Sequence, residues 1–80
     1  MRTVPITGEY IGLGQVLKFA GFVGSGGEGR ELLETGKVSV NGATEGRRGR
    51  KVRNGDIVAV RGREPVQVEG PSARRLGQAD

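Results

Sequence analysis

The spacing of the apolar residues changes at Gly36, and this change limits the possible folds more than any other feature. From Leu13 to Gly36, apolar residues recur every three or four positions, as on the buried face of a helix. After Gly36 they alternate with polar residues, as in a strand with one buried face. The 80 residues leave room for one small domain. The sequence therefore predicts an α+β domain in which a pair of helices packs on a small, mostly antiparallel β-sheet.

Two short helices are predicted before Gly36. The apolar face of the first is formed by Leu13, Val16, Leu17 and Ala20. The second begins with an S-x-x-E capping box, made by Ser25 and Glu28, and ends at Gly36. Because only residues 21–24 connect the two helices, we expect them to pack as a compact pair.

Three glycines, Gly26, Gly27 and Gly29, stand in the first turns of the second predicted helix. A glycine inside a helix costs about 1 kcal/mol relative to alanine, so these positions need a reason. Close packing against the first helix is one explanation, and backbone amides left open to an anion are another. Together with Gly24 they form a G-x-G-x-x-G pattern, but no strand precedes it, which argues against a dinucleotide site.

Several short strands are predicted, at residues 4–7, 38–40, 43–45, 57–60 and 66–68. Pro5 restricts the first of these to a sheet edge, because proline has no amide to donate. The dipeptide Asn41-Gly42 predicts a tight hairpin turn, and residues 54–56 mark a second turn.

The positive charge of the chain is concentrated in its second half. Residues 1–40 carry four basic and four acidic groups, whereas residues 41–80 carry nine and five, which accounts for the whole net charge of +4. Five of the bases fall within seven positions: Arg47, Arg48, Arg50, Lys51 and Arg53. Such a run, predicted here as a loop, is either a solvated turn or a contact for a polyanion. Its arginines favour phosphate groups, which match the planar guanidinium.

The chain contains no cysteine and no histidine, and this excludes several classes of function. Zinc sites of the Cys/His type, thiol nucleophiles, imidazole bases and disulfides are all ruled out. The carboxylates are largely explained by a helix cap, a turn and a solvent-facing helix surface. We therefore expect no catalytic residue, no metal site and no cofactor, and conclude that the protein is not an enzyme.

Aromatic residues are few, and this affects the kind of partner that we expect. The chain has only Tyr10, Phe19 and Phe22, and Phe22 is expected in the core. Proteins that read single-stranded nucleic acid stack bases on exposed aromatic rings. A basic protein with so few such rings is expected to hold phosphates and to recognise the shape of structured nucleic acid.

The sequence also predicts where the protein works. No apolar stretch approaches the length of a membrane span, and the N-terminal residues lack the apolar core of a signal peptide. Without cysteines the chain has no disulfide to support a small secreted domain. We therefore expect a cytoplasmic protein with no membrane partner and no small-molecule substrate.

The order of these parts resembles the S4 (S-four) domain, the alpha-L RNA-binding module named after small-subunit ribosomal protein four. The likeness covers residues 13–60 and is greatest to short, stand-alone bacterial proteins of the YaaA/YbcJ type. It is carried by Leu-Gly-Gln at 13–15, Ser-Gly-Gly at 25–27 and Arg-Arg-Gly-Arg-Lys at 47–51. Each piece is weak alone, but all three in this order within so short a chain are specific.

The resemblance implies a non-catalytic, monomeric protein that binds structured RNA, ribosomal or transfer RNA, as an accessory factor in ribosome assembly or translation. Its RNA-facing surface comprises the helix pair and the loop that follows, in a domain of residues 4–69 with a flexible tail at 70–80. The residues that this nominates as RNA-binding are Lys18, Ser25, Gly26, Arg30, Lys37, Asn41, Arg47, Arg48, Arg50, Lys51 and Arg53.

The chain departs from the family at two positions, since Gly12 and Gly26 stand where related domains often carry a basic residue. We expect the basic loop to compensate, with a groove between this loop and the helix pair. An alternative function is that of an adapter, in which the same loop binds an acidic protein partner.

Overall fold

Two helices and seven strands follow one another in residues 1–71, the part of the chain that the computed structural model describes. In chain order they are β1 (Arg2–Pro5), β2 (Tyr10–Gly12), α1 (Leu13–Phe19), α2 (Gly26–Glu34), β3 (Val38–Val40), β4 (Ala43–Thr44), β5 (Lys51–Arg53), β6 (Ile57–Val60) and β7 (Val66–Glu69). Most of the tail predicted at 70–80 lies outside the described residues.

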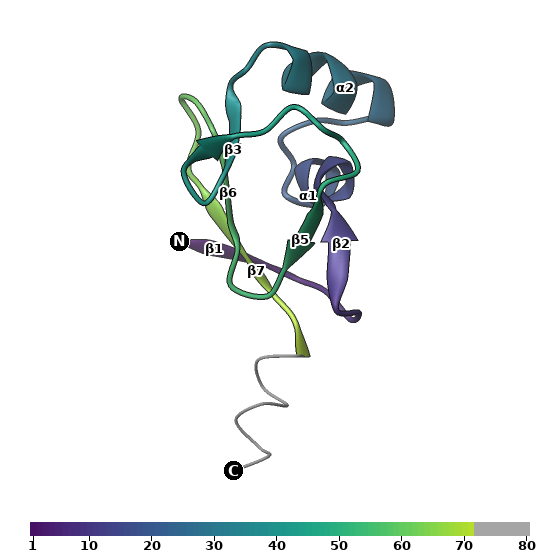
Figure 1. Ribbon diagram of the computed structural model, residues 1–80, viewed down its shortest axis with the longest axis vertical. Coiled ribbons are helices and arrows are strands. Elements are labelled where there is room, and N and C mark those ends of the chain that lie inside the picture. Colours follow the sequence, from purple (N-terminus) through teal and green to yellow (C-terminus); the bar gives the residue numbers. More distant parts are fainter. Residues whose placement is uncertain (72–80) are drawn as a thin grey trace.

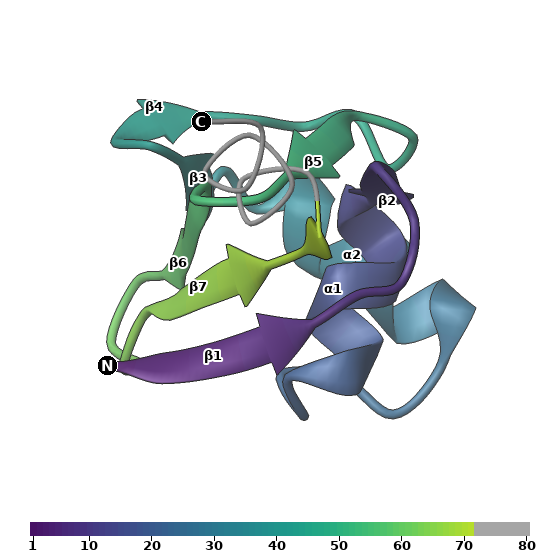
Figure 2. The same ribbon diagram turned by 90° about the horizontal axis from the view of Figure 1, so that it is seen from below.

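Five of the strands form one sheet in the order β1-β7-β6-β3-β4. Only the β1–β7 pair is parallel, and β1 lies at an edge, as its proline requires. The helix pair lies on one side of the molecule and this sheet on the other (Figures 1 and 2). The predicted α+β fold, a two-helix motif on a mostly antiparallel sheet, is therefore confirmed.

The core is built from the apolar faces that the two periods define. Leu13, Val16 and Leu17 of α1 are fully buried, and Leu33 of α2 is nearly so. Six strand valines complete the centre of this core: Val38, Val40, Val52, Val58, Val66 and Val68. Burying side chains of this size contributes roughly 1.5–3 kcal/mol each, which is the main force holding so small a domain together.

The hairpin between β3 and β4 has the predicted turn. Asn41 and Gly42 have φ angles of 52° and 87°, so both are left-handed, as the two central residues of a type I′ turn must be. Glycine adopts this conformation without strain, and asparagine does so more readily than most residues.

A two-stranded ribbon of β2 and β5 is the main difference from the sequence prediction. Residues 51–53, expected to lie in a basic loop, instead form β5 and pair antiparallel with β2. The reason is the alternation within Lys51-Val52-Arg53, because Val52 and its partner Ile11 are buried while both cations face solvent. Three residues are too few for this period to be recognised from sequence alone.

Candidate nucleic-acid interface

Residues 47–53, which we call the basic segment, are fixed to the start of α1 by main-chain hydrogen bonds. The amide of Leu13 donates to the carbonyl of Arg50 at 2.9 Å, and that of Gly14 donates to the carbonyl of Arg48 at 2.9 Å. The first amides of a helix have no partner within the helix, and Gly12 has no side chain to cap them. The loop therefore caps α1 with its backbone, which leaves the side chains of the segment to point elsewhere.

Glu45, immediately before this segment, binds two of its arginines. Its carboxylate accepts hydrogen bonds from Nε of Arg47 at 3.0 Å and from Nη1 of Arg50 at 2.9 Å, as well as from the backbone amide of Arg47. These bonds, first that from the Arg47 side chain, lower the pKa of Glu45 from 4.5 to about 2. Glu45 itself is buried, with 8 % of its surface exposed. The run of five cations thus contains two that are partly neutralised, Arg47 and Arg50.

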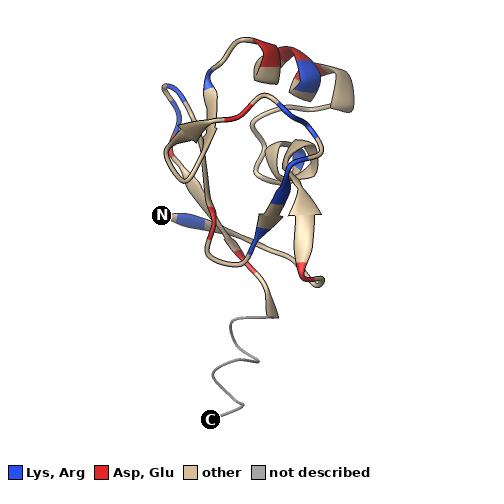
Figure 3. Ribbon diagram, viewed as in Figure 1, with Lys and Arg blue, Asp and Glu red and all other residues tan. Residues whose placement is uncertain are grey.

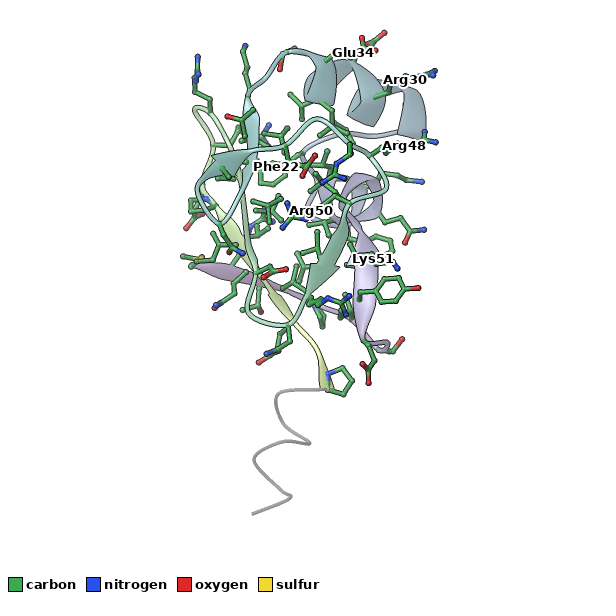
Figure 4. All side chains as sticks on the ribbon, in the orientation of Figure 1. Phe22, Arg30, Glu34, Arg48, Arg50 and Lys51 are labelled. Atoms are coloured by element: carbon green, nitrogen blue, oxygen red, sulfur yellow. The ribbon has the colours of Figure 1, made fainter. Side chains whose placement is uncertain are left out.

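Arg48 is the cation of the basic segment that lies between the two helices. With Gly14, Lys18 and Gly26 it lines one hollow of about 280 Å³ at the start of the helix pair. With Arg30 and Glu34 it lines a second hollow of the same volume beside α2. We call these two hollows, which share Arg48, the helix–loop groove. Figure 4 shows Arg30 and Arg48 extending from the same side of the molecule, whereas Arg50 lies toward the middle of the view, where it pairs with Glu45.

The first turn of α2 borders the groove with backbone amides. Oγ of the N-cap residue Ser25 accepts a hydrogen bond from the amide of Glu28 at 3.2 Å, as the capping box predicts, and the Glu28 carboxylate accepts one from Gly24 at 2.6 Å. A Cβ at Gly26 would meet nothing within 4 Å, and at Gly29 its nearest contact would be an ordinary 3.7 Å. Close helix packing therefore does not explain these glycines. The amide of Gly29 donates to the carbonyl of Ser25 at 3.1 Å, so the second explanation, an open amide, applies to Gly26 and not to Gly29.

Lys51 and Arg53 lie on β5, where both contact the ring of Tyr10. Lys51 Nζ is 4.8 Å from the ring centroid and the Arg53 guanidinium carbon is 5.5 Å away, both within cation–π range. They also line a hollow of about 670 Å³, together with Arg47, Arg50 and Asp56. Figure 3 shows the basic segment in blue as it passes α1 and continues along β5.

Two of the residues nominated from the sequence lie apart from this surface. Lys37 lines a different hollow, on the five-stranded sheet, together with Arg61 and Arg63. The Asn41 side chain donates to Asp56 at 3.0 Å and accepts from the amide of Ile57 at 2.9 Å, so its amide group holds the β3–β4 turn against β6. The other nine belong to the groove, its border or the basic segment.

Sequence reasoning missed several residues of these surfaces. Tyr10 was noted only as one of three aromatic residues, and Gln15 only as part of the Leu-Gly-Gln motif. Arg61 and Arg63 lie outside the basic run and were not singled out. Pairing between Tyr10 and Arg53, 43 positions later, is a property of the folded sheet. The opposite charges of Glu45 and the neighbouring arginines were the one local signal that was available and not used.

Two negative findings concern residues 1–71 alone. The longer helix, α2, has nine residues, and neither it nor α1 is long and apolar enough to cross a membrane. No group of three carboxylates in this part of the chain is placed to hold a metal ion.

Comparison with known proteins gives two further findings. Residues 4–69 match the family model of the S4 domain. The chain is also 42 % identical over 65 residues to a protein of Bacillus subtilis (strain 168) named "Probable ribosome maturation protein RlbA", a match that covers 81 % of this chain and 92 % of that protein. The residues matched by the family model include both helices and the whole basic segment.

Proposed function

The chain belongs to the S4 domain family, and from this premise we propose that it is a non-catalytic protein that binds structured RNA through the helix–loop groove. The observation that carries the proposal is the position of Arg48, which joins Lys18 of α1, Arg30 of α2 and the open amide of Gly26 around one groove. Cations and amides at a helix N-terminus are the groups that bind phosphate.

The charges around the groove favour a polyanion of fixed shape. Both ion pairs found among residues 1–71 involve Glu45, so Lys18, Arg30, Arg48, Lys51 and Arg53 form no ion pair with a described carboxylate. These five cations follow one path, from α2 across the groove and along β5. Folded RNA offers phosphates at fixed positions along such a path, and contacts to phosphate supply affinity without reading sequence.

The RNA that we propose is ribosomal RNA, and the role is that of an accessory factor in ribosome maturation. The name of the Bacillus subtilis relative, with which the chain shares 42 % identity, supports this choice over transfer RNA. Such a factor works in the cytoplasm, and it binds as a monomer, because one copy contains the whole groove. The carboxylates whose contacts we have described act as a cap, a turn and an ion pair, which supports a role without catalysis.

A salt titration of RNA binding tests the proposal. If five phosphates are neutralised, log affinity falls against log salt concentration with a slope of about −3.5 to −4.5. Folded ribosomal RNA should compete better than duplex DNA or unstructured RNA. Arg48→Ala should lower the slope by about one, whereas Arg61→Ala, which removes the same charge from another surface, should lower it less.

Two results would contradict the proposal. Equal and weak binding to all three nucleic acids would mean that the charge is generic. A ribonuclease-resistant complex with an acidic protein, lost in Arg48→Ala, would favour the adapter function instead.

A further inference from the structure

Two of the three aromatic side chains are exposed, although the domain is short of buried apolar surface. Phe19 is 64 % exposed and Tyr10 is 50 % exposed. Burial of a phenylalanine stabilises a small domain, so an exposed ring contributes less to the free energy of folding than a buried one would. Phe22, by contrast, is packed against the core.

Both exposed rings line the same hollow, which adjoins the helix–loop groove at Gln15. Its volume is about 460 Å³, within the roughly 300–1,000 Å³ of small-ligand sites. Pro5, Ile6 and Ile11 complete its apolar wall, and none of the residues that line it is acidic. The hollow therefore has room for a flat apolar group in contact with its aromatic lining.

The polar groups of this hollow suit a nucleobase. Gln15 lines it one helical turn before Phe19, on the exposed face of α1. Its side-chain amide, which makes no hydrogen bond to any residue in 1–71, offers both donors and an acceptor to the edge of a base. Lys51 and Arg53 lie within 4.8 and 5.5 Å of the Tyr10 ring centroid and place positive charge at the rim of the hollow.

We propose that this hollow binds one unpaired nucleotide of the structured RNA, its base against Tyr10 and Phe19 and its phosphate on Lys51 and Arg53. The inference rests on the proposed function, because the neighbouring groove must hold the folded part of the same RNA. It adds a requirement for an unpaired base, which the phosphate contacts of the groove do not impose. Stacking on aromatic rings tolerates any base, so the hollow recognises an unpaired position and not a sequence.

Two RNA hairpins that differ in one nucleotide test this inference. One contains a single unpaired 2-aminopurine as a bulge, and the other contains the same 2-aminopurine base-paired. The protein should bind the bulged hairpin roughly tenfold more tightly, and stacking should quench its 2-aminopurine fluorescence. Phe19→Ala and Tyr10→Ala should lose the preference and the quenching, with unchanged affinity for the paired hairpin. Tyr10→Phe, which keeps the ring, should retain both.

Thr3→Ala, at an exposed site on β1, is the matched control and should behave as the unmodified chain. Equal affinity for the two hairpins, with Arg48→Ala weakening both, would overturn the inference and leave the proposed function standing. Binding to neither hairpin or to any folded RNA would overturn both. The unmodified chain and Phe19→Ala are also tested on phosphatidylserine vesicles. If the unmodified chain binds the vesicles, and Phe19→Ala loses this binding but keeps its RNA binding, the Phe19 surface belongs to a membrane contact and the inference is overturned.

Discussion

The side chain of Arg48 lies directly over Gly14, and its position depends on the absence of a side chain at residue 14. A Cβ at residue 14 would come within 2.5 Å of Arg48 Cγ and 3.1 Å of its Cδ, closer than packed carbon atoms approach. The backbones of the same two residues are joined by the 2.9 Å hydrogen bond from the Gly14 amide. Because Gly14, in the first turn of α1, has no side chain, Arg48 can pack against this turn and lie between the two helices.

Gly14→Ala should therefore act on RNA binding through Arg48. The added methyl group displaces the Arg48 stem, and affinity for folded RNA should fall by roughly as much as in Arg48→Ala, about tenfold. The free energy of unfolding should change by less than about 1 kcal/mol, because alanine favours the helix. Binding titrations of both single variants and of the double variant check this, since the two effects should not add. Gly12→Ala, whose Cβ comes no nearer than 3.8 Å to the Arg48 carbonyl, is the control.

Arg48 and Arg50 should respond differently to replacement by alanine. Arg48 is exposed and forms no ion pair among the described residues, so Arg48→Ala should weaken RNA binding with a change in stability within about 0.5 kcal/mol. Arg50 is paired with buried Glu45, and its side chain is only 33 % exposed. Arg50→Ala should therefore lower the melting temperature, because Glu45 loses one partner. Equal melting temperatures for the two variants would show that this ion pair does not stabilise the fold.

Local features of the sequence predicted most of the fold, and contacts between distant segments explain what was missed. The capping box of Ser25 and the Asn41-Gly42 turn involve neighbouring residues, so their geometry follows from the local sequence. The β2–β5 pair joins residues 10–12 to 51–53, and neither strand has enough residues to show a period. For the same reason the basic segment was recognised as a charge run, while the division of its cations among Glu45, Tyr10 and the groove was not.

The glycines of α2 allow stability and RNA binding to be separated. Gly29→Ala has room for its methyl group and should stabilise the helix by up to about 1 kcal/mol without changing RNA affinity, because residue 29 is buried. Gly26→Ala has as much room but faces the groove, so its methyl group should hinder a phosphate and lower the affinity several-fold. Thermal unfolding and RNA titrations of both variants check this. Unchanged affinity in Gly26→Ala would mean that the first amides of α2 do not contact RNA.

Replacement of Asn41 distinguishes a turn residue from an RNA contact. Asn41→Ala loses the hydrogen bonds with Asp56 and Ile57 and puts alanine at a φ of 52°, so unfolding should become easier by about 1–3 kcal/mol. Asn41→Gly restores the turn conformation and should recover part of this loss. The RNA affinity of the folded variants should equal that of the unmodified chain. If both variants bind RNA more weakly while folded, then Asn41 also contacts RNA, as the family resemblance implies.

The ion pairs of Glu45 should make stability depend on pH in acid. Its carboxyl has a pKa of about 2 in the folded chain and an ordinary value of 4.5. Between these two pH values the unfolded chain binds more protons, so the free energy of unfolding rises with pH there. The stabilisation by Glu45 is complete above about pH 4.5 and is lost as pH falls through about 2.

Glu45→Gln, which lacks the charge, should therefore unfold more easily than the unmodified chain at neutral pH. The difference should shrink between pH 4.5 and about 2 and vanish below it. Urea unfolding of both proteins across the range measures the difference directly, because the other carboxylates contribute equally to both. Parallel curves from neutral pH to pH 2 would show that Arg47 and Arg50 do not hold Glu45 in solution.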